Sequence, residues 1–157
     1  MPSHRCYSMW TSLNNITFDN CQLSFPNDNV CISSCNFYST PLDLNISDAI
    51  YTGESVTINN CSFYPGSEIF NYAVNISGYG SYSVSNCNIT KFVNDTGCFR
   101  NGIQIYYCGN STSATKSINN NTINYCIGTG LMVYNSIGDI VMNKIHNNNN
   151  IYMLKYQ

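Results

Sequence analysis

A short phrase that recurs along the chain constrains its fold more than any other feature. The phrase is an apolar residue, any residue, a small polar residue, Cys or Asn, any residue and a second apolar residue. It reads FDNCQL, ISSCNF, INNCSF, VSNCNI, INNNTI and IVMNKI, beginning at Phe18, Ile32, Ile58, Val84, Ile118 and Ile140. Its shared column, Cys21, Cys35, Cys61, Cys87, Asn121 and Asn143, advances in steps of 14, 26, 26, 34 and 22 residues. A self-similar period of this length is typical of a repeat protein.

A second phrase alternates with the first. GIQIYYC, beginning at Gly102, and GLMVYNS, beginning at Gly130, match position for position at a distance of 28 residues, and AVNISGY, beginning at Ala73, is an earlier member. Within both phrases apolar residues recur at every second position, which is the period of a strand with one face turned inward. Two such strands in each period of about 26 residues predict a coil in which every period forms one rung.

Composition supports an all-β protein and excludes two classes of function. Only 9% of the residues are charged, whereas β-branched residues and Tyr, which suit strands, are abundant. The six Lys and Arg are scattered, so no basic patch for nucleic acid is present. No run of 18 apolar residues is found, which predicts no membrane insertion.

The segment GTGLMVYNSIGDIVMNKIHNNNNIYM carries the pattern most completely. It resembles the repeat of right-handed parallel β-helix proteins, the pectin-lyase-like superfamily. The resemblance is good over residues 73–154, fair from Ile32 onward, and weak before that. It implies an all-β fold, a right-handed parallel β-helix (a solenoid) of roughly five rungs.

The steps of the column also suggest how the chain is divided. A step of 14 residues is too short for a full coil, so residues 1–29 are expected to form an irregular cap or a partial rung. Residues 30–157 are expected to form the β-helix. The last residues, NIYMLKYQ, read as the start of another strand, which suggests a solenoid truncated at the C-terminus with further rungs in a longer chain.

Two interpretations of the Cys column remain open. Cys is small and apolar enough to pack inside a bend, which is the simpler reading. Alternatively, Cys61 and Cys87 lie on successive rungs, at a spacing that a disulfide accepts. The Asn residues that precede the column are expected to adopt the left-handed backbone conformation and to bond along the stack. No CxxC pair is present and the two His lie near opposite ends, so no metal site or cofactor is predicted.

The resemblance also implies what catalysis would require. Lyases of this superfamily use clustered carboxylates to hold calcium, with Arg or Lys as the base, and its hydrolases use several Asp. The eight carboxylates here are dispersed. The nearest arrangement to a catalytic site is Asp95 with Lys91 and Arg100, on the longest insertion (residues 91–101), and a solvated loop with a weak ion pair is the favoured interpretation.

Binding has better candidates. If Ile103, Ile105, Leu131 and Val133 point inward, then Gln104, Tyr106, Met132 and Tyr134 point outward. A flat, exposed Tyr106–Tyr134 pair flanked by amides suits the C–H faces and hydroxyls of sugars. The alternative interpretation is that this ladder of side chains only stabilises the sheet.

The sequence therefore favours a non-catalytic surface or extracellular scaffold used for adhesion or carbohydrate binding, with glycans as partners. The alternative is a fragment of a polysaccharide lyase or glycoside hydrolase whose catalytic rungs lie elsewhere. An Asn-rich segment without a unique fold is a third reading, against which the strict alternation argues. This role implies an extracellular or cell-surface location, although the N-terminal residues contain no apolar stretch long enough for a signal peptide.

Overall fold

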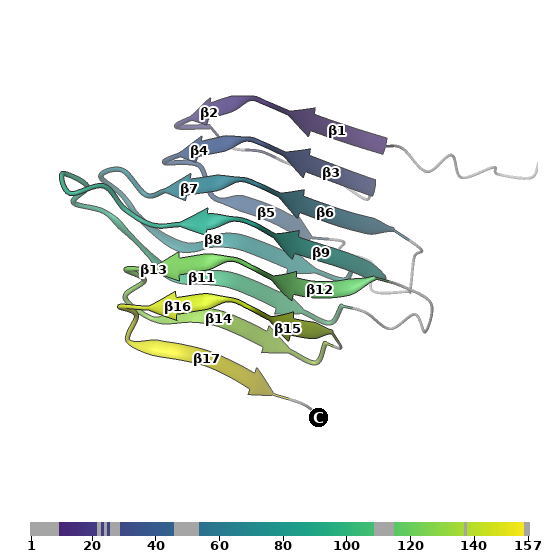
Figure 1. The fold of residues 1–157 in the computed structure, drawn as a ribbon. Helices are drawn as coiled ribbons and strands as arrows, with labels where there is room; N and C mark the ends of the chain where they lie inside the picture. The colour runs from purple at the N-terminus through teal and green to yellow at the C-terminus, as the bar shows by residue number, and fades with distance from the viewer. Residues whose placement is uncertain are drawn as a thin grey trace, which may run out of the picture.

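The fold is a stack of short parallel strands wound into three sheets. A computed structural model describes residues 10–21, 23, 25, 29–45, 54–108, 115–136 and 138–155. Every strand pairing in this part of the chain is parallel, and no helix occurs in it. Figure 1 shows the stack running from β1 and β2 at one end to β17 at the other. The near strands run in one direction and the far strands return, so the coil is right-handed as it advances, and the predicted parallel β-helix is confirmed.

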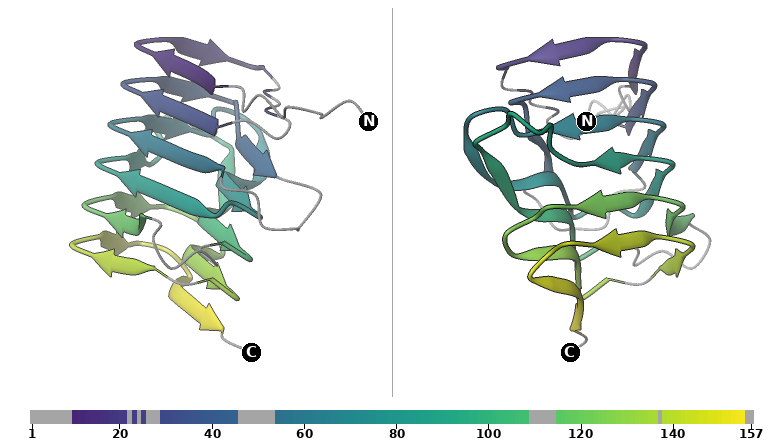
Figure 2. Two further views of the ribbon diagram at one scale, coloured as in Figure 1. Left: turned by 90° about the vertical axis from the view of Figure 1, so that its right-hand side faces the viewer. Right: turned by 60° about the vertical axis from the view of Figure 1, so that its left-hand side comes forward.

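Among the described residues, every rung contributes one strand to the first two sheets, and every rung after the first contributes one strand to the third. The first sheet contains β1 (Trp10–Asn14), β3 (Asn29–Ser33), β6 (Ser55–Asn59), β9 (Ser81–Ser85), β12 (Lys116–Asn119) and β15 (Asp139–Val141). The second contains β2 (Thr17–Asp19), β4 (Asn36–Tyr38), β7 (Ser62–Tyr64), β10 (Asn88–Ile89), β13 (Thr122–Asn124) and β16 (Lys144–His146). The third contains β5 (Leu42–Asn45), β8 (Ile69–Ser77), β11 (Cys98–Tyr106), β14 (Thr129–Tyr134) and β17 (Asn150–Lys155). Figure 2 shows the three sheets from two further sides.

The core is built from ladders of identical or similar side chains. Phe63 pairs with Ile89, Ile89 with Ile123 and Ile123 with Ile145, as the sequence predicted. The first three are fully buried, and Ile145 is partly buried beside the core. Phe37 continues the ladder, and its ring stacks on that of Phe63 with centroids 4.6 Å apart. Apolar side chains at strand spacing thus form a continuous core along the coil.

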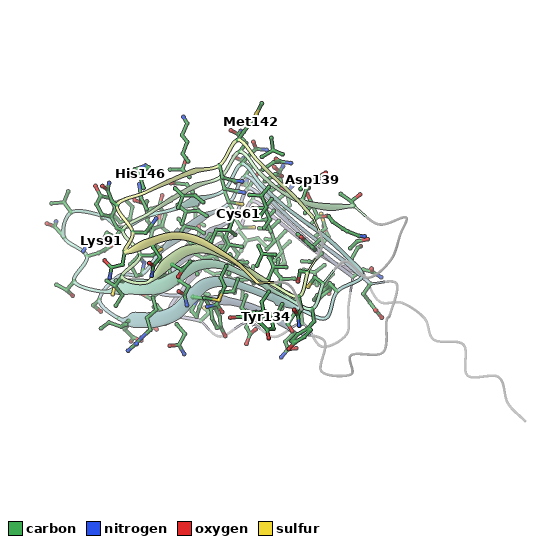
Figure 3. All side chains as sticks on the ribbon, turned by 90° about the horizontal axis from the view of Figure 1, so that it is seen from below. Cys61, Lys91, Tyr134, Asp139, Met142 and His146 are labelled. Carbon is green, nitrogen blue, oxygen red and sulfur yellow. The ribbon has the colours of Figure 1, made fainter. Side chains whose placement is uncertain are left out.

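At the corner between the first and second sheets, one residue of each rung adopts the left-handed backbone conformation and turns the chain. The residues with positive φ at this corner are Asn15, Ser34, Asn60, Asn86, Asn120 and Met142. Asn tolerates this conformation because its short amide bonds locally. The amides also bond between rungs as predicted: Nδ2 of Asn120 donates to Oδ1 of Asn86, and Nδ2 of Asn86 donates to Oδ1 of Asn59 at 2.8 Å. In the view along the stack (Figure 3), Met142 marks this corner and Cys61 lies inside the coil.

The pairing of the first rung corrects one sequence assignment. Leu13 pairs with Ile32 and Phe18 pairs with Phe37. The first member of the Cys/Asn column is therefore Ile16, and Cys21 lies at the next corner, where its N–H donates to Oγ1 of Thr40. Of residues 1–29, the structure describes 10–21, 23, 25 and 29; among these, β1 and β2 pair in parallel with the rung that follows.

Two connections extend outward from the stack and pair with each other. They join β7 to β8 and β10 to β11, and they are drawn in teal in Figure 1. The N–H of Gly97 donates to the Gly66 carbonyl at 2.9 Å, and the N–H of Cys98 donates to the Glu68 carbonyl at 3.0 Å. A Cβ at Gly97 would lie 2.0 Å from the Glu68 carbonyl oxygen, so only glycine permits this approach.

Candidate functional site

The weak catalytic candidates do not form a catalytic constellation. The carboxylate of Asp95 accepts the backbone N–H of Phe92 at 2.8 Å, and the N–H of Asp95 returns to the Phe92 carbonyl at 3.0 Å. Nζ of Lys91 lies 3.5 Å from the backbone oxygen of Asp95, while Arg100 is exposed on β11. Asp95 therefore closes a local turn in the insertion.

Aromatic stacking anchors this insertion on the second sheet. The ring of Phe92 lies 4.3 Å from that of Tyr64, with the two planes inclined by 9°. Tyr64 in turn stacks on Tyr38, one rung away, with centroids 5.0 Å apart. Offset parallel rings of this kind stabilise packing, so the insertion has a structural basis for its position.

The tyrosines of the third sheet are aligned as predicted, but they do not form a flat platform. Tyr106 pairs with Tyr134 in register, and their ring centroids are 5.9 Å apart with planes inclined by 45°. The hydroxyl of Tyr106 donates to Sδ of Met132 at 2.9 Å. Tyr107 packs edge-on against Tyr134 from the following corner. Both Tyr106 and Tyr134 are half-buried, and burial raises the pKa of Tyr106.

Gln104 points outward in register but offers little surface to a ligand. It lies between Asn75 and Met132 in the same outward column. Only 9% of it is exposed. Parallel-strand spacing brings outward neighbours this close, so the column of side chains covers the amide that the sequence assigned to sugar hydroxyls.

A pocket of about 550 Å³, which the sequence did not predict, lies on the outer side of the third sheet near its N-terminal edge. The residues that line it come from β5, from the first half of β8, and from the corner between the second and third sheets. They are Asn20, Cys21, Leu23, Phe25, Ser39, Pro41, Asp43, Asn45, Phe70 and Tyr72. The lining combines aromatic and aliphatic surface with a few polar groups, as ligand pockets do.

The register of β8 explains why the pocket exists. Residues 74–77 of β8 pair with β5, whereas Phe70 and Tyr72 lie in the half of β8 that precedes this pairing. That half is held on its other side by β11, through the pairs Cys98–Ile69 and Asn101–Tyr72. Because β8 is longer than β5, Phe70 and Tyr72 have no partner on β5 and lie beside its outward side chains.

Asp43 is the polar group of the pocket that accepts two side-chain hydrogen bonds. Its Oδ2 accepts the hydroxyl of Tyr72 at 2.8 Å, and its Oδ1 accepts Nδ2 of Asn75 at 2.9 Å. Asn75 turns its nitrogen toward the carboxylate although this leaves its own Oδ1 buried without a partner. Burial, and then the hydrogen bond and charge of Asp43, raise the pKa of Tyr72 from 10.0 to about 12, so this hydroxyl keeps its proton and remains a donor.

Three thiols are stacked inside the corner between the first and second sheets. Cys35, Cys61 and Cys87 are buried and free, so the two Cys proposed as a disulfide are unbridged in this structure. Sγ of Cys87 lies 3.3 Å from the Ser85 carbonyl, and Sγ of Cys61 takes the equivalent position. The hydrogen bond between these two thiols lowers the pKa of Cys61 and raises that of Cys87, which burial raises further.

The other corners bury thiols as well. Burial raises the pKa of Cys108 from 9.0 to about 11 and that of Cys126 from 9.0 to about 12. The folded state thus favours the protonated thiols. Their contribution to stability is fully present below pH 9 and is lost as the pH rises through 11 to 12.

Native thiol labelling is expected to separate the cysteines by burial. With iodoacetamide at pH 8, exposed Cys21 should react first, and half-buried Cys31 and Cys98 should follow. Cys108 and Cys126 should react only after denaturation, because they are both inaccessible and protonated. Mass spectrometry of peptides from native and urea-treated protein gives the measurement. Equal labelling of Cys21 and Cys126 in the native protein would contradict the inward assignment of the corner residues.

The described residues include no group of three or more His, Cys, Asp or Glu placed to hold a metal ion. In the same part of the chain, no helix has the length and apolar character needed to cross a membrane. Comparisons with protein-family models, with curated proteins and with solved structures find no match for this chain. The architecture and the pocket therefore carry the functional argument.

Proposed function

We propose that this chain is a non-catalytic β-helix scaffold that binds carbohydrate on the outer face of its third sheet, in the role of a surface or extracellular adhesion protein. The observation that carries the proposal is the pocket beside Asp43. It places the rings of Phe70 and Tyr72 and the polar groups of Asn20 and Asn45 around one hollow. Sugars need this combination, because their C–H faces pack on apolar surface while their hydroxyls form hydrogen bonds.

The tyrosines extend this site along the stack. Asn45 pairs with Ser77, Ser77 with Tyr106 and Tyr106 with Tyr134, so one outward column leads away from the pocket. Tyr106 lies two strands from Asn45, which is about 10 Å at ordinary strand spacing. A polysaccharide lying along the stack would reach both places, whereas a single sugar would occupy only one. The resemblance to pectin-lyase-like proteins, many of which act on polysaccharides, supports the same class of ligand.

Replacing Tyr106 and Tyr134 together with Ala is expected to weaken binding of long glycans about tenfold, equivalent to about 1.4 kcal/mol. Binding of monosaccharides should be weak in both proteins. Affinity of the parent for neutral glycans should grow with glycan length, resist chelators and respond only mildly to salt, because the ligand carries no charge. A glycan panel with oligomers of increasing length measures these effects.

Tyr125→Ala is the matched control, since Tyr125 is 46% exposed and lies at the corner before β14, whereas Tyr134 ends that strand. Identical glycan profiles for the parent and the double variant would remove the tyrosines from the site.

The alternative function, a fragment of a polysaccharide lyase or glycoside hydrolase, is tested in parallel with polyuronates. Calcium-dependent release of unsaturated product would overturn the scaffold proposal.

A further inference from the structure

We propose that the pocket selects glycans by charge: it accepts amino sugars best, neutral sugars next, and excludes uronic acids, with Asp43 as the residue that determines this order. The inference rests on the proposed function and names the class of sugar that the same site takes. It departs from the polyuronate substrates for which the pectin-lyase-like superfamily is named.

The charge of the pocket supports the exclusion of uronic acids. Among the ten lining residues that the structure describes, Asp43 is the one with a charged side chain, and none is Lys, Arg or His. The carboxylate of a uronic acid would therefore meet a like charge without a cation to offset it. Recognition of carboxylates in proteins depends on cationic donors, Arg above all, and the described part of the lining contains none.

The hydrogen bonds of Asp43 support the acceptance of neutral sugars. Each of its oxygens accepts one intramolecular bond, from Tyr72 or from Asn75. An ionised carboxylate has about four acceptor positions, so about two remain for donors from a ligand. Two neighbouring hydroxyls of a sugar ring are donors at suitable spacing for the two oxygens of one carboxylate.

The same two bonds hold the carboxylate in place before a ligand arrives. Tyr72 and Asn75 both belong to β8, which pairs with β5, so the strand of the next rung holds the carboxylate through two hydrogen bonds. The raised pKa of Tyr72, about 12, keeps its donor in place at neutral and moderately alkaline pH. A fixed acceptor loses little conformational entropy on binding.

The apolar part of the lining explains why the ligand is a sugar ring rather than a simple cation. Leu23, Phe25, Pro41 and Phe70 surround the polar groups. Phe25 also belongs to the hydrophobic core, so this wall is anchored in the coil. A protonated amino group on the ring would add a charge-assisted hydrogen bond to Asp43, and such bonds are about twice as strong as neutral ones.

The experiment compares three oligosaccharides of equal length: chitosan oligomers, neutral cello-oligomers and oligogalacturonate. Titration calorimetry at pH 6 and low ionic strength should rank them in this order for the parent, with at least a tenfold step between amino sugar and uronate. Asp43→Asn keeps the shape and still accepts a bond from Tyr72. It should remove most of the tenfold step while changing affinity for the neutral oligomer only a few-fold.

Asp139→Asn is the matched control, because it changes net charge equally at an exposed position of β15 in the first sheet. It should leave the ranking unchanged. Thermal melting of both variants verifies that they fold. Equal affinity of the parent for uronate and amino sugar, or an undiminished step between the two in Asp43→Asn, would overturn the inference while the binding function stands. If the parent binds none of the three oligomers and no member of the wider glycan panel, the proposed function itself fails.

Discussion

Replacing Ile123 with Asp is expected to unfold several rungs of the β-helix. Ile123 is fully buried in the ladder of the second sheet, between Ile89 and Ile145. Its side chain also fills the space beside Gly102, where an added Cβ would lie 2.5 Å from Cγ2 of Ile123. A carboxylate at this position would be buried without a partner, which costs several kcal/mol or more. Because rungs are stabilised by their neighbours, the loss should spread along the stack.

Hydrogen exchange and thermal melting measure this effect. We expect protection to fall first in β10, β13 and β16, the strands of this ladder. Ile69→Asp is the matched control, since Ile69 is 61% exposed in β8 and its substitution places the same charge in water. If Ile123→Asp melts within about two degrees of the parent, the inward assignment of the ladder is wrong, because even 1 kcal/mol shifts the melting temperature of a chain this size by about 2–4 °C.

The ladders could be predicted from the sequence because strand geometry determines them locally. Alternation at every second residue assigns the inward face, and a repeat of similar side chains aligns one rung with the next. Ile58 above Val84 and Ile105 above Val133 both follow from these two rules. Both rules depend on the backbone geometry of a strand and not on side-chain rotamers, so they can be applied to the sequence alone.

The register of the first rung could not be predicted because two different corners use the same signature. Asn60 has a positive φ and precedes inward-facing Cys61 at the corner between the first and second sheets. Asn20 has a positive φ and precedes Cys21 at the next corner. An Asn-Cys pair therefore identifies a corner without identifying which corner it is. The stacking of Phe18 on Phe37, with centroids 5.2 Å apart, decides the register.

The pocket and the tyrosine geometry required side-chain positions. Alternation in the segment LDLN predicts that Asp43 and Asn45 point outward. Extending the second phrase upstream to this segment would have identified both residues. The approach of Tyr72 to Asp43 depends on the different lengths of β5 and β8, which no local pattern encodes. Likewise, the 45° inclination between Tyr106 and Tyr134 results from packing against Met132 and Tyr107.

The Cys/Asn column changes its chemistry halfway along the stack. Asn121 is fully buried, and its Oδ1 accepts the backbone N–H of Cys87 at 2.9 Å. Its Nδ2 donates to the Val84 carbonyl and to Oδ1 of Asn143, both at 2.9 Å. Asn143 repeats this pattern on the next rung, where its Oδ1 accepts the N–H of Asn121. A thiol at the same place reaches carbonyl groups but accepts hydrogen bonds weakly.

Replacing Asn121 with Ala is therefore expected to destabilise the protein, because it leaves the N–H of Cys87 buried without a partner, at about 1–3 kcal/mol. It also removes the side-chain hydrogen bond to the Val84 carbonyl, a group that the strand pairing with β12 still satisfies. Asn121→Cys is the matched comparison. The backbone of Cys61 hydrogen-bonds to the thiol of Cys87 one rung earlier, so a thiol at position 121 should give the N–H of Cys87 an acceptor, although a weaker one than the Asn amide. Urea denaturation should place the midpoint of Asn121→Cys between those of the parent and Asn121→Ala, with similar slopes for all three. A midpoint for Asn121→Ala equal to that of the parent would show that water satisfies the N–H of Cys87 and that the column contributes shape rather than hydrogen bonds.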